Sequence, residues 1–440
     1  MAEKSPARLV VIVFVTIIVV VTALLSMPHA TNENGRAPFV DALFTATSAV
    51  AVTGLTTLDT ATYWSTFGQA VIIIGVGIGG LGIMTLASIL ALAVSRHIGL
   101  AQRMLTANET RTEKLGEVGT LVRAVIITSL TVESVIALIL FPRFLADGES
   151  IGSALWNSVF MSISIFNNAG FVILPEGLAP HVGDWWLGLP IVVGTFLGAI
   201  GFPVLMNLAR RWRHPRTWSL HAKLTLSVYG VLSLVTFFAI PAFEWSNEKT
   251  FAPLAWPDKI LAALVLSVNS RSSGLSTLEI GDMRETTWLF QEAMMFVGGG
   301  TASTAGGIKV TTLAVLVLAI VAEARGNKDI EVFQRRIPPD TLRLAVSVAF
   351  IGATLVGVSA VFLLAMTDFR LNVVLYEVVS AFGTVGLSTG ITADLPESGK
   401  LVLTFLMFAG RIGTMTVAAA LALRSKPRVI RMPEERPSVG

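Results

Sequence analysis

Cysteine is absent from the 440 residues of the chain, and charged residues are scarce at 14%. Without cysteine, neither a disulfide framework nor a thiolate metal site can form. Soluble domains carry about 25% charged residues, so a surface this poor in charge does not face water throughout. The five histidines have no spacing typical of metal ligands. The basic loops are poor in aromatic residues, so we expect no nucleic-acid-binding module and no nucleic-acid partner.

Long uncharged stretches are abundant instead. Residues 9–27 carry no charge, and a helix of about 20 such residues spans a bilayer. A signal peptide is the alternative for this stretch, but its length and the lack of a small-residue cleavage site favour a retained helix. Residues 287–322 are mostly apolar but too long for one straight crossing. We expect the other membrane segments at 65–94, 118–142 (interrupted by Arg123 and Glu133), 185–209, 224–243, 344–367 and 401–423.

Lysine and arginine concentrate in alternate connecting segments. Residues 95–123, 210–223 and 323–343 are rich in them, whereas 28–64 and 143–184 hold one arginine each. Basic loops stay in the cytoplasm, so this alternation predicts that they and both termini are cytoplasmic. We therefore expect a multi-pass protein of the cell membrane.

An internal repeat organises the chain. Four segments align around one glycine each, and these glycines lie about 110 residues apart. The segments are DALFTATSAVAVTGLTT from Asp41, WNSVFMSISIFNNAGFVI from Trp156, DKILAALVLSVNSRSSGLST from Asp258 and NVVLYEVVSAFGTVGLST from Asn372. The expected units are 1–95, 96–213, 214–326 and 327–424, followed by a cytoplasmic tail at 425–440.

Every unit has the same order: a membrane helix, a short helix with a polar turn, and a second membrane helix. The short helices hold about a dozen residues, too few to span a bilayer, and should be re-entrant. Non-helical backbone at membrane depth is tolerated only when protein or water covers it. The sequence therefore predicts an all-α integral membrane fold. Eight spanning helices and four re-entrant pore helices surround one ion pore with pseudo-four-fold symmetry.

The glycine turns resemble a potassium selectivity filter, in which backbone carbonyl oxygens replace the hydration shell of the ion. Glycine tolerates the backbone angles that point successive carbonyls at an axis. Thr384-Val385-Gly386-Leu387 is nearest to the TVGYG signature of potassium channels. The expected K+ filter residues are Val52, Thr53 and Gly54; Asn168, Ala169 and Gly170; Ser272, Ser273 and Gly274; and Thr384, Val385 and Gly386.

The chain resembles the Ktr/Trk/HKT superfamily of potassium transporters, and most closely the bacterial Ktr-type membrane subunit. The resemblance covers nearly the whole chain and rests on DALFTATSAVAVTGL, IFNNAGF, GGGTASTAGGIKVTT, SAFGTVGLSTG and FAGRIGTMT. Trk-type relatives carry additional N-terminal helices, whereas the first membrane helix here begins near Arg8. Some plant HKT relatives have serine in place of the first filter glycine and admit sodium, so Gly54 favours potassium selectivity.

Residues 287–322 contain a run of small residues that should break a helix in mid-membrane. A glycine costs about 1 kcal/mol in a helix interior, and such a loop is tolerated beside a water-filled cavity. The residues predict a flexible barrier under the filter, and the resemblance implies that this loop is the gate. Close helix packing is the alternative. The expected gate residues are Gly298, Gly299, Gly300, Thr301, Ser303, Thr304, Gly306 and Gly307.

Arg411 lies inside the last membrane segment, where a charge is costly and indicates function. The resemblance favours a positive constriction in the pore, and a structural ion pair with Glu133 is the alternative. Lys309 directly follows the gate loop, and the sequence leaves open whether it contacts the gate or faces the cytoplasm.

A glycine pattern at residues 75–80, GVGIGG, matches the GxGxxG motif of dinucleotide-binding proteins. The pattern lies in a predicted membrane helix and not in a strand–turn–helix unit, so a dinucleotide site is not expected. Tight packing of this helix against the pore helices explains the glycines better.

The resemblance implies potassium uptake through a selective, gated, channel-like pore. It implies a homodimer in membrane lipid and a cytoplasmic nucleotide-binding (RCK-type) regulatory subunit. No enzymatic activity and no cofactor are expected; K+ is the transported ion, and Na+ as an activator is left open. An alternating-access symporter would usually have inverted repeats, whereas these repeats are parallel. A membrane enzyme or receptor would need a polar catalytic cluster or a sizeable soluble domain, and the sequence shows neither.

Overall fold

The computed structural model describes residues 6–33, 35–82, 85 and 116–413, and they are mostly helical. The proposed 95/96 repeat boundary and the 425–440 tail lie outside these residues. The helices are α1 (Pro6–Leu25), α2 (Phe39–Val50), Thr66–Gly82, α4 (Gly116–Ala146), α5 (Ile151–Asn167), α6 (Trp185–Ile200), α7 (Phe202–Arg211), α8 (Leu220–Glu244), α9 (Trp256–Asn269), α10 (Glu285–Phe296), α11 (Val310–Ala324), α12 (Pro339–Met366), α13 (Leu371–Gly383) and α14 (Glu397–Phe408). Two short antiparallel strands, β1 (Ile330–Val332) and β2 (Arg335–Ile337), form a hairpin.

Three of the described helices are long and apolar enough to cross a membrane by themselves. They are α8, α12 and the part of α4 from Val122 to Ala146. Large apolar side chains such as Leu138, Phe238 and Phe350 are exposed on these helices, which suits a surface in contact with lipid. The membrane character that the low charge predicts is therefore confirmed, while the number of spanning helices stays a prediction.

Four short helices, α2, α5, α9 and α13, lie among the long ones. Each packs against the helix before it in the chain, α2 on α1, α5 on α4, α9 on α8 and α13 on α12, and α5 and α13 also pack against the helix after them, α6 and α14. Packing of α6 on α9 and of α14 on α2 joins segments that are far apart in sequence. The four short helices fall where the aligned segments predict them.

Capping residues explain where several of these helices begin and end. The side chain of Ser150 accepts a hydrogen bond from Ser153 N at the start of α5, and Asp184 caps α6 in the same way. Asn168 ends α5 and Thr384 ends α13, each in the left-handed conformation. Such a residue commonly terminates a helix, so the chain turns sharply just before Gly170 and Gly386.

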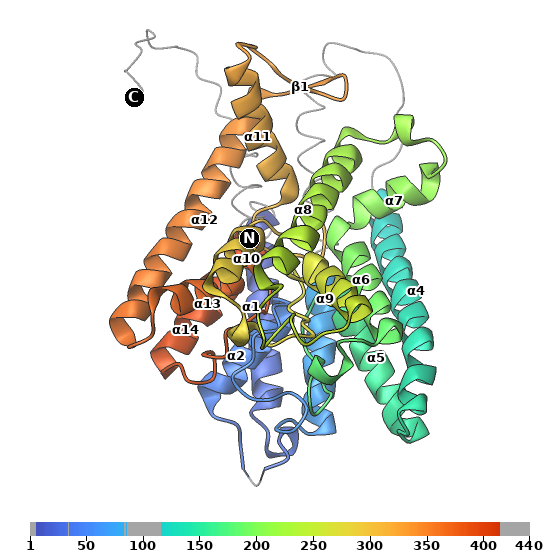
Figure 1. Cartoon of the computed structure of the whole chain (residues 1–440), viewed down its shortest axis with the longest axis vertical. Helices are drawn as coiled ribbons and strands as arrows, with labels where there is room; N and C mark the ends of the chain where they lie inside the picture. Colours follow the sequence, from blue (N-terminus) through green and yellow to red (C-terminus); the bar gives the residue numbers. More distant parts are fainter. Residues whose placement is uncertain (1–5, 34, 83–84, 86–115, 414–440) are drawn as a thin grey trace.

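Basic segments gather at one end of the molecule. The α7–α8 connection and the β1–β2 hairpin both lie at the upper end in Figure 1. Arg210 and Arg211 end α7, and Arg335 and Arg336 lie in β2. This arrangement agrees with one basic face, as the charge pattern predicts. Most of the segment 95–123 lies outside the described residues.

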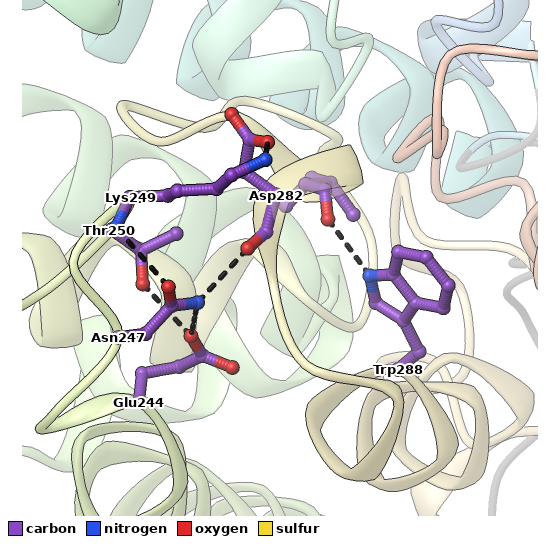
Figure 2. Close-up of polar contacts among 7 residues, drawn as sticks. Glu244, Asn247, Lys249, Thr250, Asp282 and Trp288 are labelled. Carbon is purple, nitrogen blue, oxygen red and sulfur yellow. Dashed lines mark hydrogen bonds and ion pairs between the residues drawn. The ribbon is translucent and has the colours of Figure 1, made fainter.

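A buried carboxylate fixes the connections at the other end of α8 (Figure 2). Glu244 is fully buried. It accepts hydrogen bonds from Asn247 Nδ2 (2.6 Å), Thr250 Oγ1 (2.8 Å), the backbone N of Arg284 (2.9 Å) and Thr287 Oγ1. Asn247 and Thr250 lie in the α8–α9 connection, whereas Arg284 and Thr287 lie at the start of α10, so this carboxylate ties the start of α10 to the end of α8.

The second helix of a unit departs from a regular helix in three of the four predicted units. Residues 287–322 break between α10 and α11, as predicted. Residues 185–209, predicted as one span, are instead bent by 101° between α6 and α7, because Gly201 has a φ of 91°. The regular part of the last segment ends at Phe408, and residues Ala409–Gly413 form a π-helix that includes Arg411.

Candidate ion pathway

The four glycines that the repeat predicts lie against one another in cyclic order. A Cβ atom built on Gly54 would come within 3.0 Å of Gly170 Cα, and one on Gly170 would meet Ser273 O. A Cβ on Gly274 would likewise meet Gly386, and one on Gly386 would meet the backbone of Thr53. Each glycine is therefore packed against the backbone of the next turn, and the fourth turn returns to the first.

Three of the four turns share one backbone conformation. Val52, Asn168 and Thr384, each two residues before a glycine, have φ values of 57°, 59° and 47°. In each turn the next N–H donates to a serine carbonyl in the short helix: Thr53 to Ser48, Ala169 to Ser164, and Val385 to Ser380, at 2.8–2.9 Å. The two residues before each glycine are buried and the glycine is partly exposed in all four turns. These turns are thus structural equivalents.

Serine hydroxyl groups support the first and fourth turns directly. Ser48 Oγ accepts a hydrogen bond from Gly54 N (3.0 Å), and Ser380 Oγ accepts one from Gly386 N (3.1 Å). In the second turn, Ser164 Oγ donates to Phe171 O (2.7 Å). These bonds satisfy backbone groups next to the glycines, which a buried turn requires.

The third turn differs: Ser272 N and Ser273 N both donate to Asn269 O (3.2 Å), and Arg271 directs its side chain to α8. Its side chain is fully buried and stacks on Tyr229 of α8, with the guanidinium carbon 3.6 Å from the ring centroid. It also donates to Tyr229 O (3.0 Å) and to Ser233 Oγ. Sequence reasoning did not single out Arg271. The signal was present, since an arginine in a membrane segment, three residues before the predicted filter glycine Gly274, indicates function.

The loop between α10 and α11 lies directly beside the turns. A Cβ on Gly306 would meet the side chain of Thr384, and one on Gly307 would lie 3.3 Å from Gly383 Cα. The Asn168 side chain hydrogen-bonds the hydroxyl groups of Ser272 (3.0 Å) and Thr304 (3.1 Å). The predicted gate residues are therefore in contact with the second and fourth turns, and all of them except Thr301 are buried.

Backbone hydrogen bonds join this loop to the bend between α6 and α7. Gly300 N donates to Ala199 O (2.8 Å), Thr304 N donates to Gly198 O (3.3 Å), and Phe202 N donates to Ala302 O (3.1 Å). The bend of the second unit thus supplies the polar partners that the open backbone of the third unit needs. The sequence did not predict this second interruption.

Two cationic side chains also contact the loop. Arg411 is 3% exposed and its Nη1 donates to Thr304 O. Lys309 Nζ donates to Ala305 O (2.5 Å) and lies 3.4 Å from Gly306 O. Of the two alternatives that the sequence left open, the structure shows Lys309 in contact with the predicted gate loop.

Glu133 does not pair with Arg411, so that alternative is wrong. Glu133 Oε1 accepts a hydrogen bond from Asn167 Nδ2 (2.8 Å) at the end of α5. Among residues 116–413, no ion pair links Glu133 and Arg411. The physical reason is that Glu133 on α4 packs beside α5, whereas Arg411 reaches the loop of the third unit.

The glycine pattern at 75–80 serves helix packing, as predicted. A Cβ on Gly79 would meet Val50 O at the end of α2, and one on Gly80 would meet the side chain of Asn167. Gly198 and Gly410 approach Phe166 O and Phe382 O in the same way. Glycine is needed here because a second helix lies against the last carbonyls of the short helix of its own unit.

Comparison with known proteins agrees with this geometry. The model of the TrkH family, described as a cation transport protein, matches residues 5–428. The chain is 38% identical over 432 residues to the Ktr system potassium uptake protein B of Bacillus subtilis (strain 168). This alignment covers 98% of this chain and 96% of the relative. It is 31% identical over 427 residues to the potassium/sodium uptake protein NtpJ of Enterococcus hirae, covering 96% and 94%.

A solved structure has the same fold. The crystal structure of the potassium transporter TrkH from Vibrio parahaemolyticus superposes with a TM-score of 0.74 at 18% sequence identity, covering 96% of this chain and 86% of that one. The resemblance to the Ktr and Trk transporters that the sequence motifs indicate is confirmed. The chain belongs to the TrkH family of cation transport proteins.

Proposed function

We propose that this chain takes up potassium across the cell membrane through a selective, gated, channel-like pore. It would act as the membrane subunit of a Ktr-type transport system. The observation that carries the proposal is the cyclic packing of Gly54, Gly170, Gly274 and Gly386. Four equivalent turns around one axis provide the rings of carbonyl groups that a potassium filter needs.

The pore in this proposal consists of four helix–pore-loop–helix units. In support, the four short helices end within a few residues of their glycines and begin with exposed apolar residues, Phe39, Ile151, Trp256 and Leu371. The C-terminal end of a helix carries a partial negative charge, so four such ends favour a cation. The ion ligands would be the carbonyl groups of the two residues before each glycine.

The loop at 298–307 would be the gate. In support of this, a polar, glycine-rich segment contacts the second and fourth of the proposed filter turns. Arg411 would add a positive constriction there, since its side chain is buried against Thr304. A cation has to pass this charge, so flux is expected to be limited at this level.

Partners and orientation belong to the same proposal. The basic end with the α7–α8 connection and the β1–β2 hairpin would face the cytoplasm, together with both termini. A nucleotide-binding regulatory subunit would dock there, and two membrane subunits would pair. Relatives with the names Ktr system potassium uptake protein and potassium/sodium uptake protein support K+ as the transported ion. They leave Na+ as an activator to experiment.

The test is rubidium uptake by a potassium-uptake-deficient bacterial strain that expresses this chain with a cognate regulatory subunit. Gly386→Ser is compared with Gly390→Ser, in the presence and absence of competing sodium. Both glycines have a positive φ, 93° and 102°, but a Cβ meets the Thr53 backbone only at Gly386 and meets nothing within 4 Å at Gly390.

We expect Gly386→Ser to abolish uptake or to admit sodium, because the new side chain collides with the neighbouring turn. Gly390→Ser should keep selective uptake. Equal effects of the two substitutions would overturn the filter, since backbone strain alone would then explain them. Absence of uptake by the wild-type chain, despite its presence in the membrane, would overturn potassium transport.

A further inference from the structure

A basic pocket lies at the start of α8, at the opposite end of this helix from Glu244. It holds about 410 Å³ between the α7–α8 connection and the β1–β2 hairpin, two segments that lie at the upper end in Figure 1. Arg211, Arg216, Lys223 and Arg335 contribute its cationic side chains, and its lining residues include no carboxylate. The pore proposed above does not use this pocket.

Local contacts hold the walls of this pocket in place. Arg211 Nη1 donates to Thr217 O (2.9 Å), and Lys223 Nζ donates to Arg216 O (3.0 Å). The Lys223 ammonium also lies 5.8 Å from the ring centroid of Phe333 at the tip of the hairpin. Hydrogen bonds and a cation–π contact therefore position these side chains, although none of them has a carboxylate partner among the described residues.

Acidic groups of the hairpin do not neutralise the pocket. Asp329 pairs with Arg336 at 2.8 Å, and Glu331 is opposite Arg336 in the strand register. Arg336 is not among the lining residues, whereas its neighbour Arg335 is. In the hairpin, Arg336 thus faces the acidic residues Asp329 and Glu331, whereas Arg335 lines the pocket. The positive charge of the pocket therefore remains available to an anion.

The position of the pocket along the membrane normal indicates which anion. Ser219 and Leu220 line it, and Leu220 is the first residue of the candidate span Leu220–Glu244. The pocket therefore lies where a span leaves the apolar layer, at the depth of lipid headgroups. Basic pockets at the cytoplasmic ends of membrane helices suit anionic headgroups, and each Lys or Arg near the surface contributes about 1 kcal/mol.

We propose that this pocket binds the phosphate group of an anionic membrane lipid. Arg211, Arg216, Lys223 and Arg335 surround the phosphate, and the N-terminal end of α8 adds its partial positive charge. Guanidinium groups suit a phosphate because they donate two parallel hydrogen bonds. A bound lipid would join the α7–α8 connection to the β1–β2 hairpin between α11 and α12. The α7–α8 connection follows the bend at Gly201, and the hairpin follows the loop at 298–307 and α11.

The test compares two triple variants of the full-length protein purified in detergent. Arg216→Gln/Lys223→Gln/Arg335→Gln removes three charges from the pocket. Arg213→Gln/Lys328→Gln/Arg336→Gln removes three charges from the same two segments but outside the pocket. Native mass spectrometry measures binding of phosphatidylglycerol and phosphatidylcholine, and inorganic phosphate is added as a competitor in a separate arm.

We expect the wild-type chain and the outer variant to bind phosphatidylglycerol in preference to phosphatidylcholine. The pocket variant should bind phosphatidylglycerol about tenfold more weakly or worse. An equal loss in both variants would show general surface attraction and overturn the proposal. Displacement of the lipid by inorganic phosphate at equal concentration would overturn the lipid as ligand, because the free anion would then bind as well. Size-exclusion profiles establish that both variants are folded, and no readout depends on ion transport.

Discussion

Arg271 combines two properties that conflict at the scale of a single residue. It is a fully buried cation, and it belongs to a turn that we propose to bind another cation. Its guanidinium stacks on Tyr229 and donates to Tyr229 O and Ser233 Oγ, so it connects the third turn to α8. The benefit of positioning should therefore exceed the electrostatic cost of the charge.

We predict that Arg271→Gln and Arg271→Lys both lower the preference for rubidium over sodium by about tenfold, equivalent to ~1.4 kcal/mol. Lysine keeps the charge but cannot stack and donate to two acceptors at once. Rubidium uptake with sodium competition measures the change. If Arg271→Lys behaves like the wild type while Arg271→Gln does not, the charge matters and the positioning role is wrong.

Tyr229 offers a matched control for this experiment. Its hydroxyl group is buried and has no hydrogen-bond partner in the described part of the chain, and Tyr229→Phe keeps the ring and the backbone carbonyl that Arg271 uses. We expect Tyr229→Phe to leave uptake and selectivity unchanged. Tyr229→Ala removes the stacking surface and should reproduce the Arg271 variants.

The bend between α6 and α7 is the decisive feature at the scale of secondary structure elements. Gly201 has a φ of 91°, and a Cβ on it would lie 2.6 Å from Thr301 O. The bend therefore packs closely against the proposed gate loop, and three backbone hydrogen bonds join the bend and the loop. Any side chain at this position strains the bend and displaces the loop.

We predict that Gly201→Ala raises basal rubidium uptake per molecule, because the loop loses its contacts with the bend. A residue other than glycine is also strained at the backbone angles of Gly201, φ 91° and ψ 148°, by about 1–3 kcal/mol, so the thermal midpoint should fall. Gly230→Ala in α8 is the control, since a Cβ there meets nothing within 4 Å, and it should leave uptake unchanged. Unchanged or reduced uptake by Gly201→Ala would argue against a loop that restricts flow.

The helices and loops around this bend also show how far the sequence predicts the structure. The short helices and the interruption after Phe296 were predicted, because a repeated pattern and a cluster of five glycines within residues 298–307 leave few alternatives. Gly201 was missed because one glycine in an apolar run usually serves packing, as Gly198 does here. Arg271 was missed because its role depends on Tyr229, and the sequence does not show that α8 packs on α9.

Closure of the proposed ring is a property of the whole molecule. The last unit has to meet the first, and α14 packs on α2. Lys400 Nζ of α14 lies 2.8 Å from Asp41 Oδ1 at the start of α2, and their side chains are only 13% and 11% exposed. This ion pair joins segments 359 residues apart, so it acts on the arrangement of units and not within a unit.

We predict that Asp41→Asn and Lys400→Met each destabilise the protein by about 3 kcal/mol, because each leaves the other charge buried without a partner. The double variant should cost less than either single one, since no unpaired charge remains. Thermal unfolding midpoints of the purified full-length chain measure both effects. Lys249→Met is the control, because its pair with Asp282 is 70% and 41% exposed and contributes at most about 1 kcal/mol.

Strictly additive losses at Asp41 and Lys400 would mean that the two side chains stabilise α2 and α14 separately. The contact between the first and fourth units would then rest on the packing of α14 on α2 and of Gly386 against Gly54, without a contribution from the ion pair.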